Sequence, residues 1–364
     1  METEGGGVCC LILPFFHFHL TSFCFHHTLS SFCSLFALLF SNRISSLPHT
    51  LGLLSRLRKL MLSNNSLLSS QNICDCRNLE LLRLANNPLR VLQPCLSRMP
   101  KLAWISISGT PLALPVTPPM NLRLPSYDLS DRSSWRPLGA GASGQVFAIR
   151  WRRTVPAALK LFHALSSDGR PESEVALTVS ASAAPGCVRV LAYFPHPRWG
   201  LISELLEGFA PLAKPPSFAS VSRDVYAPRT SFSMHGATAV LLVVARACAY
   251  LHDVLHISHG DLYGHNIMVR QHVLEGSKHV LLSDVRLTDF GAAFRYDRGG
   301  LDFQALEARA FGILADELID RSPPNDSRLS ALQAMSVRCV GPHTEQRPRF
   351  VELAAMLEGL WQQL

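Results

Sequence analysis

Leucine and isoleucine recur at a fixed spacing between residues 57 and 112, and this spacing restricts the fold of the region more than any other feature. Each unit has the form L-x-x-L-x-L followed by a polar residue and another leucine. The units are Leu57-x-x-Leu60-x-Leu62-x-x-Asn65-x-Leu67, Leu79-x-x-Leu82-x-Leu84-x-x-Asn87-x-Leu89 and Leu102-x-x-Ile105-x-Ile107-x-x-Thr110-x-Leu112. Upstream, Asn42-x-Ile44-x-x-Leu47-Pro48 fits the tail of one more unit.

The asparagine position recurs every 22 or 23 residues. The alternating leucines predict a short strand with one buried face, and the asparagine is expected to bind backbone groups inside the turn. No single unit buries its leucines alone, so the units must stack. The pattern resembles the leucine-rich repeat, which implies a short α/β solenoid over residues 41–113. Its concave face would bind a protein partner or would dock on the next domain.

The first forty residues differ from the rest of the chain. Val8 to Phe40 contains no Asp, Glu, Lys or Arg and is long enough to span a bilayer. The stretch also holds four histidines, and it follows Met-Glu-Thr-Glu, which fits neither a secretory signal nor a transit peptide. We therefore interpret residues 1–40 as a separate apolar extension, and membrane contact through residues 8–40 stays open.

Residues 114–127 are rich in proline and predict a linker that is too short and broken to cross a membrane. The repeats and the remaining domain should then lie on the same side of any membrane. Of the ten cysteines, only three fall after residue 127, and those three are far apart. Cys74-x-Cys76 has no second pair at zinc spacing, so we interpret it as part of a loop. This usage favours a reduced, cytoplasmic protein.

The net charge is +7, but the basic residues are scattered, so no nucleic-acid partner is expected.

A glycine-rich segment begins the third region. Leu138-Gly139-Ala140-Gly141-Ala142-Ser143-Gly144-Gln145-Val146 has the form G-x-G-x-x-G-x-V. Such small residues let a hairpin lie close to the phosphates of a nucleotide with its N–H groups toward them. Gly139, Gly141, Ser143, Gly144 and Val146 are the predicted nucleotide contacts, with Val146 against the base.

Three further signals follow in order. Lys160 ends the apolar run Ala157-Ala158-Leu159 and is placed to contact phosphates. It needs a carboxylate partner, for which Glu174 is the first choice and Glu172 the second. Leu201-Ile202-Ser203-Glu204-Leu205-Leu206 predicts a strand and hinge, in which the backbone of Glu204 and Leu206 would bond adenine.

A predicted helix over residues 238–251 precedes His259-Gly260-Asp261-Leu262-Tyr263-Gly264-His265-Asn266, which has the form H-x-D-x-x-x-x-N. Asp261 would orient an acceptor hydroxyl, and Asn266 would ligate Mg²⁺. Asp-Phe-Gly follows at 289–291, and Asp289 is the second predicted metal ligand.

The order and spacing of these elements resemble a eukaryotic-type protein kinase over residues 128–364. The resemblance implies an α+β bilobal fold, with a β-rich N-lobe at 128–203 and a helical C-lobe at 207–364. It also implies ATP and Mg²⁺ as cofactors, with transfer of the γ-phosphate to a Ser/Thr hydroxyl of a protein substrate. Glu307 and Arg347 match structural elements of the family. The whole chain resembles a soluble leucine-rich repeat kinase.

The sequence departs from that family at three places. Gly260 replaces an arginine, Tyr263 replaces a lysine, and only 16 residues separate Gly291 from Glu307. Regulation by phosphorylation of the activation loop is therefore not expected. Two alternatives stay open, namely a pseudokinase that serves as a binding scaffold and a phosphotransferase that acts on a small molecule.

Overall fold

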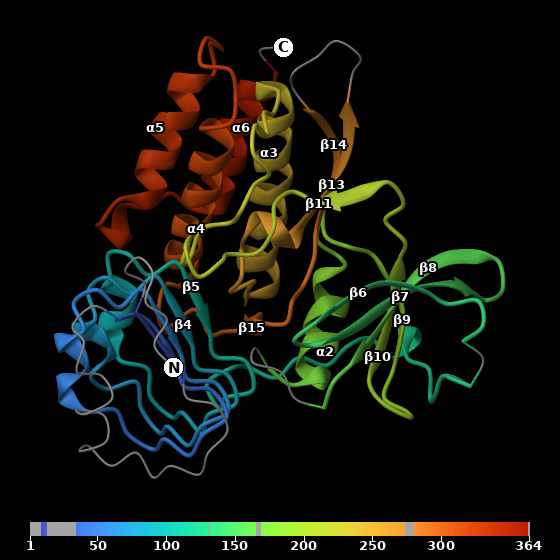
Figure 1. Cartoon of the computed structure of the whole chain (residues 1–364), viewed down its shortest axis with the longest axis horizontal. Helices are drawn as coiled ribbons and strands as arrows, with labels where there is room; N and C mark the ends of the chain where they lie inside the picture. The colour runs from blue at the N-terminus through green and yellow to red at the C-terminus, as the bar shows by residue number, and fades with distance from the viewer. Residues whose placement is uncertain (1–8, 13–33, 131, 165–168, 274–279, 363–364) are drawn as a thin grey trace.

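The computed structural model describes residues 9–12, 34–130, 132–164, 169–273 and 280–362. It is a mixed α and β structure with several sheets and helices. Figure 1 shows three regions: a stack of short strands and loops, an antiparallel sheet, and a group of helices that lies next to both.

The first sheet has five parallel strands in sequence order. Its strands are β1 (Cys9–Ile12), β2 (Ser34–Leu38), β3 (Lys59–Met61), β4 (Leu81–Arg83) and β5 (Trp104–Ser106). Short 3-10 helices at His49–Leu53, Ile73–Asp75 and Pro94–Arg98 lie between the strands of what we call the repeat segment (residues 41–113).

The predicted domain boundary at residue 40 does not coincide with an edge of the parallel sheet, which also includes residues before 40. Strand β2 pairs with β3, and β1 pairs with β2, so both extend the parallel sheet of the repeat segment. Residues 13–33, which make up most of the apolar stretch between 8 and 40, lie outside the described residues.

The asparagine position of the repeats behaves as the sequence predicts. Asn65 is buried, and its Nδ2 donates to the carbonyls of Leu39 at 2.8 Å and Leu62 at 2.9 Å, while its Oδ1 accepts from the N–H of Ile44. Asn87 repeats this arrangement one turn later, with Nδ2 at 2.9 Å from the carbonyl of Leu62. Each side chain thus joins consecutive turns where buried backbone groups need partners.

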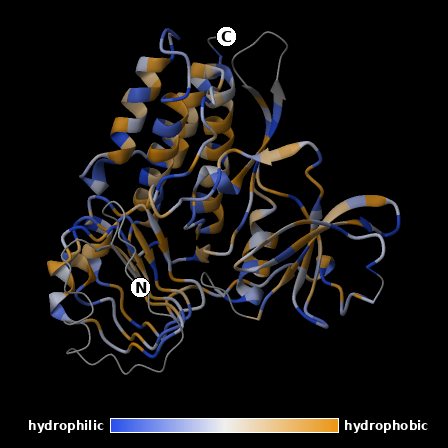
Figure 2. Ribbon diagram, viewed as in Figure 1, coloured by the Kyte–Doolittle hydropathy of each residue, from blue (hydrophilic) through white to orange (hydrophobic). Residues whose placement is uncertain are grey.

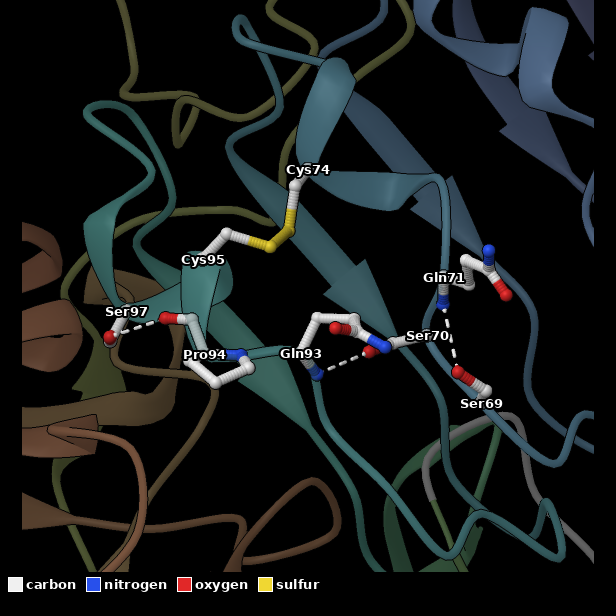
Figure 3. The surroundings of a disulfide bond; sticks show 8 residues. All are labelled: Ser69, Ser70, Gln71, Cys74, Gln93, Pro94, Cys95 and Ser97. Atoms are coloured by element: carbon white, nitrogen blue, oxygen red, sulfur yellow. Dashed lines mark hydrogen bonds between the residues drawn. A yellow bond between two sulfur atoms is a disulfide. The ribbon is translucent and has the colours of Figure 1, made fainter.

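Cys74 is not the unpaired loop residue that the sequence suggested. It forms a disulfide with Cys95, 21 residues further along the chain, and Figure 3 shows how the bond joins two neighbouring loops of the repeat segment. Close by, the N–H of Gln93 donates to the hydroxyl of Ser70 at 2.9 Å, so the same loops are also joined by a hydrogen bond. A single Cys-x-Cys motif gave no indication of this partner.

The second sheet is antiparallel, with strand order β6-β7-β8-β10-β9. Its members are β6 (Arg136–Gly141), β7 (Gly144–Trp151), β8 (Val155–Phe162), β9 (Val190–Phe194) and β10 (Gly200–Glu204). Helix α2 (Pro171–Ala181) lies between β8 and β9 in sequence, and it begins with proline and an acidic first turn, both of which favour a helix N-terminus.

The proline-rich segment 114–127 is attached to the antiparallel sheet and is not a free linker. It contains a short 3-10 helix, Met120–Leu122. The N–H of Leu124 donates to the carbonyl of Tyr193 at 2.8 Å, and the ring of Tyr127 stacks on Phe194 with centroids 5.0 Å apart. The apolar residues among the prolines supply this contact, which composition alone does not reveal.

The third region contains four α-helices and several short strands. The helices are α3 (Met234–Tyr250), α4 (Phe303–Ile319), α5 (Leu329–Val340) and α6 (Phe350–Trp361). The strands are β11 (Phe209–Pro211), β12 (Ile257–Ser258), β13 (Ile267–Val273), β14 (Val280–Leu287) and β15 (Phe294–Arg295). Single turns lie at Leu251–Leu255, Gly264–Asn266 and Thr344–Gln346.

Helix α3 confirms the helix that was predicted over residues 238–251. The hydroxyl of Ser233 caps it by accepting from the N–H of Gly236. Together with the turn that follows, it is the one helix among the described residues that is long and apolar enough to span a membrane, but over half of its most apolar window is buried. Figure 2 shows hydrophobic residues along it, as expected of a core helix.

The repeat segment and the helical region share buried side chains. Leu81 and Trp104 from β4 and β5 belong to the core formed by the helices. Conversely, Phe294 and Phe303 belong to the core formed by the repeat leucines. The guanidinium of Arg347 donates to the carbonyls of Ala305 at 3.0 Å and Pro100 at 2.9 Å, which joins the two regions further. They therefore pack as one continuous interior.

Candidate functional site

Lys160, Glu174 and Asp289 come together although they lie far apart in sequence. Lys160 is in β8, and its Nζ contacts Oε1 of Glu174 in α2. Oδ1 of Asp289 lies 3.8 Å from the same Nζ. Glu174 is buried whereas Glu172, the second choice, is exposed. Of the two candidate carboxylates in α2, Glu174 is therefore the one that holds Lys160.

Asp289 has a local environment that favours its ionised form. The positive charge of Lys160 lowers the pKa of Asp289, and the hydrogen bond from the N–H of Gly291 at 3.2 Å acts in the same direction. The backbone of Asp289 has φ of 59°, which is unusual for a residue with a side chain. Such backbone conformations are concentrated at functional sites.

Asp261 and Asn266 lie on the loop between β12 and β13. Nδ2 of Asn266 donates to both the carbonyl and Oδ2 of Asp261, each at 2.9 Å. These two bonds use both N–H groups of the amide, which leaves Oδ1 of Asn266 as its acceptor atom. The predicted base and the predicted metal ligand are therefore in direct contact.

Glu307 in α4 fixes the beginning of this loop. Its carboxylate accepts from the N–H of Gly260 at 2.7 Å, from the N–H of His259 at 3.1 Å, and contacts Nε2 of His252 at 2.6 Å. Burial alone would disfavour the ionised form, but the hydrogen bond from His252 and the other donors lower the pKa of Glu307. The structural role that the sequence predicted for Glu307 thus takes the form of a buried carboxylate that binds loop amides.

The glycine-rich segment forms the end of the hairpin β6–β7. A Cβ added to Gly144 would lie 2.3 Å from the carbonyl oxygen of Leu161, so the sheet itself requires glycine there. Gly139 and Gly141 are different, because a Cβ on either would meet none of the described residues within 4 Å. Ser143 is in the turn, and half-buried Val146 pairs with Lys160 across β7 and β8. One strand of this hairpin, β7, therefore pairs directly with β8, the strand that carries Lys160.

The predicted hinge residue Glu204 ends β10, and Leu206 lies two residues further along the chain. The N–H of Glu204 donates to the carbonyl of Arg189 at 2.9 Å, and the carbonyl of Leu206 accepts from Phe209. Those two backbone groups are occupied. The carbonyl of Glu204 accepts a long hydrogen bond of 3.4 Å from the hydroxyl of Ser203. A planar ring could bond to the second lone pair of that carbonyl and to the N–H of Leu206.

Two residues of the repeat segment contact the loop that carries Asp261, and the sequence did not identify them as site residues. Arg83 in β4 forms an ion pair with Oδ1 of Asp261 and donates to the carbonyl of Gly260 at 2.7 Å. Trp104 in β5 donates from Nε1 to the carbonyl of Leu262 at 3.0 Å. The only available signal was that Arg83 stands between Leu82 and Leu84, where its side chain points away from the buried leucines.

Tyr263 and Gly260, two of the departures noted in the sequence, are explained by this contact. The ring of Tyr263 is buried and stacks on Trp104 with centroids 4.3 Å apart and planes 6° apart. Gly260 has φ of 72°, and a Cβ there would lie 2.6 Å from the carbonyl oxygen of Ile105. A larger residue at 260 would separate the loop from the repeat segment.

A second cluster of polar side chains contacts the far end of the loop that carries Asp261, at His265. Nδ1 of His265 lies 2.7 Å from Oδ1 of Asp224, whose Oδ2 accepts from the N–H of His265 at 3.1 Å. Glu317 in α4 accepts from the hydroxyl of Tyr226 at 3.1 Å and from the N–H of Asp224. Burial raises the pKa of Glu317 to about 7, and the charge of Asp224 adds to the shift.

The donor set fits Mg²⁺ bound with nucleotide phosphates. Mg²⁺ is commonly held by one or two protein oxygens and completes its coordination with phosphate and water. Oδ1 of Asn266 and the carboxylate of Asp289 supply that number of ligands. Within the described residues, no group of three or more His, Cys, Asp or Glu side chains could hold a metal alone. A pocket of about 320 Å³ lies elsewhere, between α2 and residues 108–118.

No family model matches this chain, and no curated protein matches it.

Proposed function

We propose that the chain is a phosphotransferase that uses Mg–ATP, with a protein-kinase-like bilobal fold preceded by a short leucine-rich repeat solenoid. The observation that carries the proposal is the cluster in which Lys160 contacts Glu174 and lies 3.8 Å from Asp289. A lysine fixed by a carboxylate in a helix, beside a second carboxylate, suits a triphosphate and its metal ion.

In this proposal the residues of the chain have separate tasks. Lys160 binds the phosphates, and Glu174 holds Lys160 in position. Asn266 and Asp289 hold Mg²⁺, which would neutralise charge on the phosphates during transfer. Asp261 orients the acceptor hydroxyl and takes its proton, and the proposed acceptor is a Ser or Thr of a protein. Gly139 and Gly141 let the hairpin lie close to the phosphates. Packing against the described residues does not itself require glycine at either position, which supports this role.

The repeat segment has a specific place in the proposal. Its strand residues Arg83 and Trp104 are buried against the loop that carries Asp261, which supports docking within the chain in preference to an open concave surface.

The proposed localisation is cytoplasmic. The disulfide between Cys74 and Cys95 runs against that localisation, because disulfides are rare in reducing compartments.

The test is Mg²⁺-dependent transfer of labelled γ-phosphate to the chain itself and to casein. Lys160→Met and Asp261→Ala should each reduce transfer by about 10²-fold or more, since positioning of phosphate or nucleophile is lost. Lys214→Met is the matched control, because Lys214 is exposed, and it should leave transfer unchanged.

Two other outcomes favour other functions. Equal, background-level labelling by wild type and Asp261→Ala would favour a scaffold without activity. This alternative draws support from the contact of Arg83 with the carboxylate of Asp261. Consumption of ATP without labelling of protein would favour a small-molecule acceptor.

A further inference from the structure

The loop from His259 to Asn266 contains no lysine or arginine of its own. The cation beside Asp261 comes from outside the loop, and it is Arg83 of β4. One guanidinium nitrogen contacts Oδ1 of Asp261, and another donates to the carbonyl of Gly260 at 2.7 Å. The side chain of Arg83 is only 4% exposed, so it is a fixed part of the interior.

Neighbouring contacts show that the repeat segment is shaped to fit this loop. Trp104 binds the carbonyl of Leu262 and stacks on Tyr263. The backbone of Ile105 approaches Gly260 so closely that only glycine fits. Four successive loop residues, 260 to 263, are therefore contacted by β4 and β5 together.

The contact leaves Asp261 able to act on an acceptor. A carboxylate has about four lone-pair positions, and here the contacts to its oxygens are from Arg83 on Oδ1 and from Asn266 on Oδ2. The side chain of Asp261 remains 22% exposed. The pairing of Lys160 with Glu174 is present in the same structure, so the rest of the cluster is assembled while Arg83 is bound.

The contact between Arg83 and Asp261 cannot be broken by movement of the repeat segment without disrupting a shared core. Leu81 and Trp104 are within the core of the helical region, and Phe294 and Phe303 are within the core of the repeat segment. Withdrawal of Arg83 from Asp261 by movement of the repeat segment would expose all of these side chains to water, which is strongly unfavourable.

We propose that Arg83, supplied by the repeat segment, is a positioning residue for phosphotransfer. It orients the carboxylate of Asp261 through its charge and its hydrogen bond to Oδ1, while its second hydrogen bond, to the carbonyl of Gly260, holds the loop in place. The inference rests on the proposed function. It assigns to the repeats a role in completing the site, in addition to any role in choosing a partner.

The experiment compares full-length Arg83→Gln, Arg83→Lys and Arg90→Gln. Arg90 belongs to the same segment but is exposed, so Arg90→Gln is the matched control. Rates of γ-phosphate transfer to casein at saturating Mg–ATP, the KM for ATP and the melting temperature are measured for each. Arg83→Gln should lower kcat by about 10²-fold. Its KM for ATP should stay within about twofold of wild type, because the contacts of Lys160 are untouched.

Arg83→Lys keeps the charge but loses the planar pair of donors, so it should recover part of the lost rate. Recovery by lysine, together with a melting temperature close to that of wild type, separates positioning from a loss of folding. An unfolded fraction would lower the apparent kcat without changing KM, so the melting temperature is the control for folding. If Arg83→Gln does not fold, Arg83→Lys alone must still show a reduced kcat with an unchanged KM.

Three results would overturn the inference. Arg83 variants with the rate of Arg90→Gln would show that Asp261 needs no help from the repeat segment. A higher rate in Arg83→Gln than in wild type would show that the contact inhibits. Absence of transfer by wild type would overturn the proposed function, and the inference with it, whereas the first two results leave the proposed function intact.

Discussion

The carboxylate of Glu307 accepts a hydrogen bond from the backbone N–H of Gly260 at 2.7 Å, while the carbonyl of the same glycine accepts one from Arg83, also at 2.7 Å. One residue of the loop is thus held by α4 on one side and by β4 on the other. Because both partners are buried and charged, the position of the loop depends on two side chains that are separated by more than two hundred residues in sequence.

Glu307→Gln should reduce the free energy of unfolding by about 2 kcal/mol, since hydrogen bonds to a charged group are worth about 1.5–3 kcal/mol and an amide cannot accept all three donors at once. Urea denaturation at pH 7 measures the change. Glu358→Gln is the control, because Glu358 is 42% exposed in its pair with Arg246 and such pairs contribute about 1 kcal/mol or less. Equal effects of the two substitutions would contradict the anchoring role of Glu307.

Glu174→Gln and Glu172→Gln test the pairing in α2. The two residues are in the same first turn, but only Glu174 contacts Lys160. Loss of its charge should reduce the proposed phosphate transfer by about 10–10²-fold, because Lys160 is no longer fixed. Glu172→Gln should transfer at the wild-type rate. The comparison uses the same labelling assay, and a larger effect at 172 would exclude the pairing as the functional one.

Local sequence patterns predicted the parts of the structure that depend on local chemistry. The helix at 238–251 follows from an apolar stretch that a serine caps. The contacts of Asn65 and Asn87 follow from the spacing of the leucines. Likewise, Glu174 is the first choice as the carboxylate partner of Lys160, and that contact is present.

Contacts between distant segments could not be predicted in this way. The approach of Arg83 to Asp261 depends on how the repeat segment packs against the helices, which no local pattern encodes. The same is true of the strand pairing of residues 34–38 and of the docking of Tyr127 on Phe194. The disulfide of Cys74 depends on two loops being brought together by the stacking of the repeats.

The disulfide between Cys74 and Cys95 should stabilise the repeat segment. It closes a loop with a sequence separation of 21, for which the loss of chain entropy in the unfolded state corresponds to about 3 kcal/mol. The double variant Cys74→Ser, Cys95→Ser should lose about that much free energy of unfolding, and dithiothreitol should do the same to wild type. Dithiothreitol should leave the double variant unchanged. A wild type indifferent to reduction would contradict the prediction.

Glu317 should make stability depend on pH in an unusual direction for a carboxylate. Its pKa rises from an ordinary value of 4.5 to about 7 in the folded chain because of burial. The folded state therefore binds the proton more tightly than the unfolded state does. The resulting stabilisation is complete below pH 4.5 and is lost as the pH rises from 4.5 to about 7.

Glu317→Gln removes this proton linkage and keeps a side chain of nearly the same shape. The free energy of unfolding of wild type minus that of Glu317→Gln should therefore fall as the pH rises from 4.5 to 7, and then stay level to pH 8.5. Urea denaturation at steps of half a pH unit measures the difference, in which the titration of other groups largely cancels. Glu345→Gln is the control, because Glu345 is 69% exposed, and its difference from wild type should show no such fall. A difference for Glu317→Gln that rises over the same interval would mean that Glu317 is stabilised as the carboxylate, and the burial argument would then be wrong.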